Sequence, residues 1–319
     1  MTDPEFAVTR QNAPTAYFFG VTTAASSSRR MFPLWAEILG LGQARLIGVD
    51  LPLNGPPEVY RRAVYQIKRD PLSLGAVITS HKINTLNAAR DLFDHLTPEA
   101  ELTGEVASIY KRDGALIGHA VDPMTSGLAM SRFIPARHWG RTRAHILCLG
   151  AGGSATAIAV HLCRTLPPDN RPARVIFVNR TRPRLESLRQ LIAERLPGSG
   201  IAFEFVENSD PAINDRLMAA LPPGSLVINA TGMGKDTPGS PITDAGVFPQ
   251  DGFAWELNYR GTLDFLHQAE AQAERRNLTV VDGWDYFLLG WSTIIGQIFD
   301  VPITPEVYDR LAQAAAAVR

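Results

Sequence analysis

The sequence predicts an α/β protein of two lobes. Apolar segments rich in β-branched residues alternate with segments of helical spacing along the chain of 319 residues, and such alternation is typical of a mostly parallel sheet. A chain of this length is long enough for two domains. A hairpin ending near Asp122 interrupts the alternation, and no strand follows residue 283. We therefore expect one lobe from residues 1–121 plus 283–319 and a second lobe from 122–282.

In the first lobe, three strands and three helices precede the hairpin. The first helix ends in a glycine, and Pro57 lies near the start of the second, as expected at helix ends. Strands are expected at 16–23, 44–53 and 74–80, helices at 29–42, 56–70 and 81–96, and the hairpin at 106–122 around the turn Arg112-Asp113-Gly114.

The second lobe continues the alternation. Its first strand, 144–153, is a near-continuous apolar run, as expected of a strand buried on both faces. Further strands are expected at 173–180, 200–207, 225–231, 253–259 and 278–283, and helices at 123–133, 154–166 and 183–196. The last stretch, 284–300 with the Ala-rich tail, is helical, and we expect it to return to the first lobe.

The overall composition limits the partners and the location of the protein. A net charge of −1 argues against a general nucleic-acid surface. No apolar run approaches the ~18 residues of a membrane span, and the N-terminal segment lacks the basic-then-apolar order of a signal peptide. We therefore expect a cytoplasmic protein, a monomer or homodimer, without a nucleic-acid or membrane partner.

Cysteine and histidine usage predicts neither a disulfide framework nor a metal site. The two cysteines, Cys148 and Cys163, are too few for a framework, and Cys148 lies inside an apolar strand, which favours a buried structural thiol. His81 and His119 belong to no cluster with metal-ligand spacing, so no metal is expected.

A glycine-rich turn joins the strand at 144–153 to the helix that follows. Glycine at 150, 152 and 153 permits a tight turn and close approach of the backbone to a pyrophosphate. The N-terminus of the helix then supplies free N–H groups and positive potential. The sequence therefore predicts a Rossmann-type dinucleotide site at this turn, formed by Gly150, Ala151, Gly152, Gly153 and Ser154.

The next strand ends in Asn179, where an NAD-binding unit usually carries an acidic residue. Arg180, Arg182 and Arg184 follow it, and arginine pairs with a phosphate through two parallel charge-assisted bonds. Thr181 adds a hydroxyl. The segment therefore favours NADP over NAD as cofactor, with a solvated basic loop as the alternative.

Together these motifs resemble the shikimate dehydrogenase family. The segment 150–157 is similar to that family's cofactor turn, and 179–181 to its phosphate-binding segment. Residues 229–234, "NATGMG", resemble the loop near the nicotinamide, which adds Thr231, Gly232 and Met233 to the expected cofactor contacts. The resemblance covers most of the chain and implies a small-molecule substrate, bound in the first lobe.

The resemblance also implies the catalytic and substrate-binding residues. Ser26 and Ser28 match the serine pair that holds a substrate carboxylate, and Tyr259 matches a loop over the active site. Lys82 and Asp122 match the catalytic lysine and aspartate. Lysine moves the proton that accompanies hydride transfer when its pKa is tuned towards neutrality. Taken alone, Lys82 reads as a surface lysine, and Asp122 before a proline reads as a helix N-cap.

The substrate segments depart from the family pattern. Ala107, Ala120 and Gly290 stand where the family has amide side chains that contact the substrate. A site that has lost such partners discriminates differently among hydroxyl patterns. We therefore expect a dehydrogenase acting on a hydroxylated cyclic acid or polyol, with shikimate itself a poor substrate.

Several alternatives remain at this point. Quinate, aminoshikimate or a carba-sugar (cyclitol) would suit the same chemistry. A non-catalytic NADP(H)-binding regulatory protein would explain the altered pocket. A folate-type methylene dehydrogenase shares two lobes and a lysine, although it leaves Asp122 and the serine pair unexplained.

Overall fold

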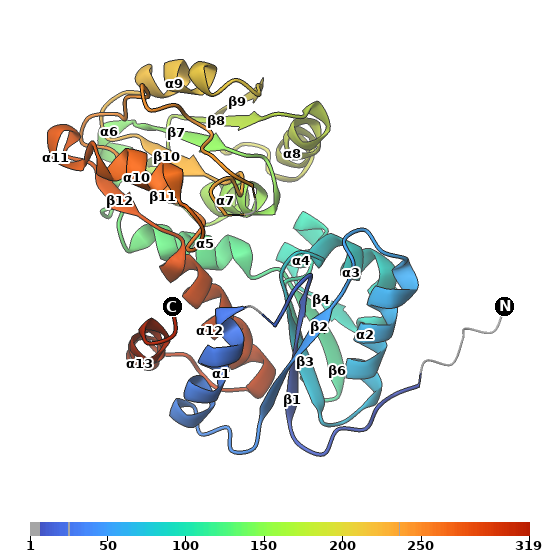
Figure 1. Cartoon of the computed structure of the whole chain (residues 1–319). Coiled ribbons are helices and arrows are strands. Elements are labelled where there is room, and N and C mark those ends of the chain that lie inside the picture. Colours follow the sequence, from blue (N-terminus) through green and yellow to red (C-terminus); the bar gives the residue numbers. More distant parts are fainter. Residues whose placement is uncertain (1–6, 25, 236) are drawn as a thin grey trace. The chain divides into compact units, whose positions relative to one another are not determined.

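The computed structural model describes residues 7–24, 26–235 and 237–319 and divides into two compact units (Figure 1). The first unit comprises Met1–Val121 with Leu288–Arg319, and the second comprises Asp122–Phe287. The chain returns to the first unit inside helix α12 (Trp284–Phe299), whereas the sequence analysis puts the return at residue 283, before that helix. Within the described residues, no helix combines the length and apolar character that a membrane crossing requires.

The first unit is built on a six-stranded sheet in the order β2-β1-β3-β5-β6-β4. β1 pairs in parallel with β2 and β3, whereas β5 is antiparallel to β3 and β6. The turn between β5 and β6 consists of Asp113 and Gly114 alone, both at positive φ (52° and 80°), as a tight two-residue hairpin requires. The strands are β1 (Thr15–Gly20), β2 (Arg45–Asp50), β3 (Ser73–Ile78), β4 (His95–Leu96), β5 (Ser108–Arg112) and β6 (Ala115–His119).

Helices cover this sheet on both faces. Alternate residues of a strand point to opposite faces, so Tyr17 and Phe19 pack with Tyr60 of α2 on one face. Phe18 points to the other face, where its ring meets Trp291 of α12 edge-on at a centroid distance of 5.0 Å. The helices of the N-terminal segment are α1 (Ser27–Ile38), α2 (Pro57–Arg69), α3 (Lys82–Ala89) and α4 (Pro98–Thr103), with a 3₁₀ turn at Arg90–Leu92.

From Leu288 onwards, the C-terminal segment belongs to the first unit. The Trp35 indole N–H of α1 donates to the Leu311 carbonyl oxygen of α13 (Pro305–Ala316) at 2.9 Å. The rings of Phe32 and Phe299 lie 5.9 Å apart between α1 and α12. These contacts tie the end of the chain to its first helix.

The second unit holds a six-stranded sheet in the order β12-β11-β10-β7-β8-β9, in which every pairing is parallel. The strand order runs outward from β7 in both directions, which is the doubly wound arrangement of Rossmann-type units. The Rossmann-type prediction is therefore confirmed. The strands are β7 (His145–Leu149), β8 (Arg174–Asn179), β9 (Ala202–Glu207), β10 (Leu226–Asn229), β11 (Phe253–Glu256) and β12 (Thr279–Val281).

The helices of the second unit divide into predicted and unpredicted ones. The long helices α5 (Asp122–Ser131), α7 (Gly153–Arg164) and α8 (Arg182–Arg195) follow the predicted ranges closely. The sequence analysis missed α6 (His138–Thr142), α9 (Pro211–Ala219), α10 (Asp264–Glu270) and α11 (Ala273–Arg276). These helices have nine residues or fewer, too few for a clear apolar periodicity. Conversely, the helix expected over 81–96 ends at Ala89, where the 3₁₀ turn begins.

Helix α5 packs directly against α7 (Figure 1), and the contact depends on a glycine. A Cβ atom at Gly127 would overlap the ring of His161, which is 7% exposed. Burial lowers the pKa of His161 to about 4, so the ring is neutral at physiological pH. Gly127 therefore supplies the space that this buried ring fills.

Gly127→Ala is expected to destabilise the second unit by about 1–3 kcal/mol, the usual penalty for overpacking a core. Gly290→Ala in α12 is the matched control, because a Cβ there would meet no atom within 4 Å and alanine favours a helix by up to ~1 kcal/mol over glycine. Hydrogen–deuterium exchange of the α7 amides measures the effect. Unchanged exchange in Gly127→Ala would show that His161 moves aside freely.

Candidate functional site

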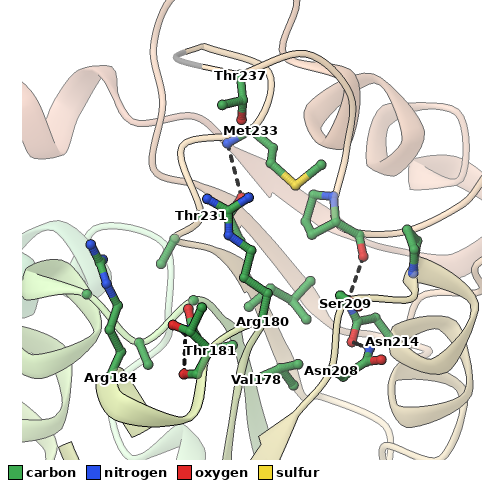
Figure 2. Close-up of a pocket in the computed structure, with 18 residues that line it drawn as sticks. Val178, Arg180, Thr181, Arg184, Asn208, Ser209, Asn214, Thr231, Met233 and Thr237 are labelled. Carbon is green, nitrogen blue, oxygen red and sulfur yellow. Dashed lines mark hydrogen bonds between the residues drawn. The ribbon is translucent and has the colours of Figure 1, made fainter. Parts of the chain in front are cut away.

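A cavity of about 520 Å³ lies at the carboxyl ends of β7, β8 and β10 in the second unit. The strand order reverses between β7 and β10, and open parallel sheets bind ligands in the crevice at this reversal point. Its volume is within the range of small-molecule sites. The lining residues are Leu149, Gly150, Ala151, Gly152, Val178, Asn179, Arg180, Thr181, Arg184, Asn208, Ser209, Pro211, Asn214, Ala230, Thr231, Met233, Thr237 and Pro241 (Figure 2).

The glycine turn forms the base of this cavity. The Gly150 N–H donates to the Val178 carbonyl at 2.7 Å, and the Ala230 N–H donates to the Leu149 carbonyl at 2.7 Å. Gly150 has a φ of 120°, and a Cβ there would lie 2.5 Å from the Ala230 carbonyl oxygen. Only glycine fits this backbone. Helix α7 begins at Gly153, just behind the turn, so its free N–H groups and dipole favour an anionic ligand there.

Two of the three arginines after β8 line the cavity, and the third does not. Arg180 and Arg184 are lining residues, whereas the Arg182 Nε donates to the Glu207 carboxylate at 2.9 Å. That ion pair raises the pKa of Arg182 further. Arg182 thus differs from Arg180 and Arg184, because β9 brings Glu207 next to it.

The rim at the end of β8 carries no carboxylate. The Asn179 side-chain amide donates to the Thr181 hydroxyl at 2.9 Å and to the Thr181 carbonyl at 3.0 Å, which holds the loop between β8 and α8. Gly152 lies beside the same rim, because a Cβ at that position would be 3.3 Å from a guanidinium nitrogen of Arg184. The site therefore combines two cations, a threonine hydroxyl and a helix N-terminus, a set of groups that suits phosphates.

Most of the predicted cofactor residues line the cavity, with three exceptions. Gly153 and Ser154 are not among the lining residues, because they already belong to the first turn of α7. Gly232 lies inside the loop between the lining residues Thr231 and Met233, at a φ of 78°. It shapes that loop without lining the cavity.

The structure adds a polar group that the sequence analysis missed. Asn208 and Ser209 follow β9, and the Asn208 amide donates to the Asn214 side-chain oxygen at 2.8 Å. The Asn214 amide in turn donates to the Pro241 carbonyl at 2.7 Å. Polar residues directly after the third parallel strand were the available signal, because the carboxyl ends of such strands meet at one edge.

The loop over residues 231–234 is held by hydrogen bonds from the end of β10. The Asn229 side-chain oxygen accepts from the Thr231 N–H at 3.1 Å and from the Thr231 hydroxyl at 2.7 Å. The Thr231 hydroxyl oxygen accepts from the Met233 N–H at 3.1 Å (Figure 2). These hydrogen bonds order the loop that follows β10 on one side of β7, whereas the arginines follow β8 on its other side.

In the first unit, the predicted serine pair forms the N-terminus of α1. Ser26 is the N-cap, and its hydroxyl lies 2.8 Å from the hydroxyl of Ser28. Ser28 is completely buried. The backbone N–H of Ser28 donates to the Ser26 hydroxyl at 3.3 Å. The Thr23 N–H and hydroxyl both donate to one oxygen of Asp50 at 2.7 Å, which anchors the chain before the pair. Two hydroxyls at a helix N-terminus are suited to a carboxylate.

Lys82 is the first residue of α3 and is half-buried. Its carbonyl oxygen accepts from the Val106 N–H at 3.3 Å, which ties the helix to the segment before β5. His81, directly before it, is completely buried beside the Tyr60 ring at a centroid distance of 5.4 Å. Burial lowers the pKa of His81, so its ring next to the lysine is neutral at physiological pH.

Asp122 is the first residue of the second unit and is half-buried. Helix α5 begins at Asp122 itself, so the expectation of Asp122 as the N-cap with Pro123 at the first helical position is off by one residue. Proline is tolerated at the second position for the same reason as at the first, since the N–H groups of the first turn have no helical acceptor.

Tyr259 packs in an aromatic cluster of the second unit. Its ring lies 5.3 Å from that of Trp284 and 4.4 Å from that of Phe287, and burial raises its pKa. Among the positions that depart from the family pattern, Ala107 and Ala120 are buried, with 1% and 0% exposure. A Cβ at Gly290 would meet nothing within 4 Å. These three positions of the first unit thus present two methyl groups and an open space.

Comparisons with known proteins found similar sequences and similar solved structures. No family model matches the chain. A shikimate dehydrogenase (NADP(+)) of Symbiobacterium thermophilum is 31% identical over 231 residues, covering 72% of this chain and 71% of that protein. The solved structure of a shikimate dehydrogenase in complex with NADP+ superposes with a TM-score of 0.71 at 20% identity, covering 99% of both chains. A ligand-free 5-ketofructose reductase of Gluconobacter sp. strain CHM43 superposes with a TM-score of 0.68 at 20% identity, covering 97% of this chain and 99% of that one.

Proposed function

Because the chain belongs to the shikimate dehydrogenase family, we propose that it interconverts a carbinol and a ketone on a hydroxylated cyclic acid or polyol. The protein is an NADP-dependent oxidoreductase that acts on a CH–OH group. The observation that carries the proposal is the cavity at the carboxyl ends of β7, β8 and β10, with Arg180, Thr181 and Arg184 on its rim.

The residues of this cavity fit NADP. The glycine turn leaves no room for a side chain at Gly150, so a pyrophosphate can approach the backbone at the N-terminus of α7. Asn179 stands where a carboxylate would repel a ribose phosphate, and Arg180 and Arg184 offer bidentate partners for it. Thr231 and Met233 would then border the nicotinamide. NADP supplies the hydride acceptor or, when reduced, the hydride donor.

Ser26, Ser28 and Lys82 of the first unit are proposed to serve substrate binding and proton transfer together with Asp122 and Tyr259 of the second unit. Ser26 and Ser28 would hold a carboxylate through their hydroxyls and the N-terminus of α1. Lys82 would exchange the proton at the reacting substrate oxygen, and Asp122 would accept a hydrogen bond from the substrate and orient the lysine. The neutral ring of His81 supports this role, because it adds no positive charge beside Lys82. Tyr259 is the remaining residue proposed to contact the substrate.

The substrate is proposed to differ from shikimate in its hydroxyl pattern. Ala107 and Ala120 cannot form side-chain hydrogen bonds, and Gly290 leaves space on α12. A site that hydrogen-bonds a substrate hydroxyl rejects an analogue without that hydroxyl, because a buried polar group is left unpaired. At these three positions the site has no such polar group, so an analogue without the hydroxyl is accepted. The fold also carries 5-ketofructose reduction in the Gluconobacter protein, so ring acids are not its sole substrates.

A screen of cyclic polyols and hydroxy acids with NADP⁺ and NAD⁺, followed by absorbance of the reduced nicotinamide, tests this proposal. We expect turnover of a cyclitol, quinate or aminoshikimate, and little with shikimate. A kcat/KM for shikimate of about 10⁴ M⁻¹s⁻¹ or more, the ordinary enzyme range, would contradict the altered specificity. Tight NADP binding without turnover of any compound would favour the regulatory alternative.

Arg180→Ala is expected to weaken NADP⁺ binding by about 10- to 100-fold, the scale of a lost charge-assisted hydrogen bond. NAD⁺ binding should change little, because NAD⁺ lacks the 2′-phosphate. Arg195→Ala is the matched control, because Arg195 lies exposed at the end of α8 and is not among the lining residues. Isothermal titration calorimetry measures both cofactors. Equal losses for NADP⁺ and NAD⁺, or equal losses in both variants, would overturn the assignment of Arg180.

Lys82→Ala is expected to lower kcat by about 10²- to 10⁴-fold, the usual contribution of a general acid or base. NADP⁺ binding should be retained, because Lys82 belongs to the first unit. Asp122→Asn keeps the polar side chain at the start of α5, so the melting temperature should change little while kcat falls sharply. If Asp122→Asn is as active as the parent, Asp122 serves α5 alone.

A further inference from the structure

A buried carboxylate lies next to the cavity, outside the residues assigned above. Glu256 ends β11, is 0% exposed and lies opposite Asn229 in the parallel pairing of β10 with β11. One of its oxygens accepts from the Asn229 side-chain amide at 2.6 Å. The other accepts from the Asn258 backbone N–H at 2.8 Å and from the Asn258 side-chain amide at 2.6 Å.

Backbone groups set the orientation of the Asn229 and Asn258 side-chain amides, because a backbone N–H can only donate a hydrogen bond and a carbonyl can only accept one. The Thr231 N–H is a fixed donor, so the Asn229 side-chain oxygen must face it. The Met233 carbonyl is a fixed acceptor, and it receives the side-chain N–H groups of Asn229 at 3.3 Å and Asn258 at 3.1 Å. The hydrogen-bond partners of Glu256 in the described structure are therefore all donors, and a donor cannot accept a proton from a carboxylic acid.

The same bonds hold the loop over residues 231–234, which borders the cavity through Thr231 and Met233. The loop is also joined to the following segment, because the Leu263 N–H donates to the Gly234 carbonyl at 3.2 Å. The positions of Thr231 and Met233 thus depend on two asparagines whose amide groups both point at Glu256.

We infer that Glu256 is a positioning residue: its ionised carboxylate fixes the 231–234 loop for cofactor binding, and its protonation releases that loop and weakens NADP binding. The inference rests on the proposed function, in which this loop borders the nicotinamide. A protonated Glu256 would place an O–H against an N–H, so Asn229 or Asn258 would have to turn. A turned Asn229 presents its amide N–H groups to the Thr231 N–H, and a turned Asn258 loses the Met233 carbonyl.

The electrostatic surroundings bring this protonation into the physiological range. Burial raises the pKa of Glu256 to about 7, although the hydrogen bonds from Asn258 and Asn229 oppose the shift. The negative charge of Asp282, which follows β12, contributes to this raised value. On the sides formed by β10 and the 231–234 loop, the hydrogen-bonding groups of this network are amides and backbone groups, which carry no charge.

The sign of the pH effect follows from which form binds. If the ionised form binds NADP⁺ and the protonated form does not, binding releases a proton, and affinity falls as the pH drops through about 7. Between about pH 8 and about pH 6, the loss approaches tenfold for one linked proton. The protonated folded state is also the more stable one, because the pKa is raised relative to the unfolded chain, so folding stability and cofactor affinity respond to pH in opposite directions.

Calorimetric titration of the full-length protein with NADP⁺ at about pH 6 and about pH 8 tests the inference. Glu256→Gln always presents an N–H to one of the asparagines, so it should bind NADP⁺ at least about tenfold more weakly than the wild type at about pH 8, and its affinity should lack the tenfold fall of the wild type between about pH 8 and about pH 6. Glu204→Gln, the same substitution at an exposed position of β9 that pairs with Arg174, is the control and should follow the wild type. Protonation of the 2′-phosphate affects all three proteins alike.

Parallel pH profiles for the wild type and Glu256→Gln would overturn the inference. Failure of the wild type to bind NADP⁺ at about pH 8 would instead overturn the proposed function. Side-chain amide resonances of Asn229 and Asn258 in the wild type, followed by NMR without cofactor, decide the network independently of binding and of the folding of any variant. They should shift with a midpoint near the pKa of Glu256, and resonances that stay unchanged between about pH 6 and about pH 8 would exclude its protonation in this range.

Discussion

The candidate site depends on one close approach between two stretches of backbone, that of Gly150 to Ala230. The turn after β7 bonds to β8 through the Gly150 N–H, and the chain after β10 bonds to the end of β7 through the Ala230 N–H. These two bonds bring three strand ends together around one cavity. A side chain at position 150 would meet the Ala230 carbonyl, so the cavity and the turn could not coexist with any other residue.

Among the described residues that line the cavity around this turn, a polyanion meets two arginines and no carboxylate. Asn179 ends β8 and uses its amide to hold Thr181, and Arg180 and Arg184 line the cavity. The nearest acidic side chain of the neighbouring strand, Glu207, is paired with Arg182. The pairing removes one cation from the ligand but also neutralises the carboxylate that would otherwise repel a phosphate. Preference for a phosphorylated ribose is therefore a property of two strands together.

The two units differ in how many hydrogen-bonding side chains they place at the following residues. In the second unit, Asn229 and Asn258 are fully engaged with Glu256 and the 231–234 loop, so the cofactor side is rigidly specified. In the first unit, no side-chain hydrogen bond can form at Ala107, Ala120 or Gly290. A buried polar group left without a hydrogen-bond partner costs binding free energy, whereas a methyl group loses no hydrogen bond when a ligand lacks a hydroxyl. Under the proposed function, cofactor choice and substrate choice would therefore depend on different physical interactions.

The sequence by itself determined the elements with strong local patterns. The apolar runs of β7 and β8, the glycine turn at 150–153, the arginines after Asn179 and the Asp113-Gly114 turn follow from residue type and spacing over a few positions. The doubly wound order follows from the alternation of strands and helices. Short helices such as α9 and α10 escaped prediction, because a periodicity of 3.6 residues is not visible in so few residues.

Only the tertiary structure decided which side chains meet. Arg182 and Glu207 come from neighbouring segments 25 residues apart, and Asn229 and Glu256 are 27 residues apart on paired strands. The strand register that joins them is set by packing across the sheet, and no local pattern carries it. In the sequence, the arginines at 180, 182 and 184 look equivalent, and no local pattern distinguishes Glu256 from other glutamates. Folding separated Arg182 from the cavity and buried Glu256 beside it, because burial and pairing depend on residues that are distant along the chain.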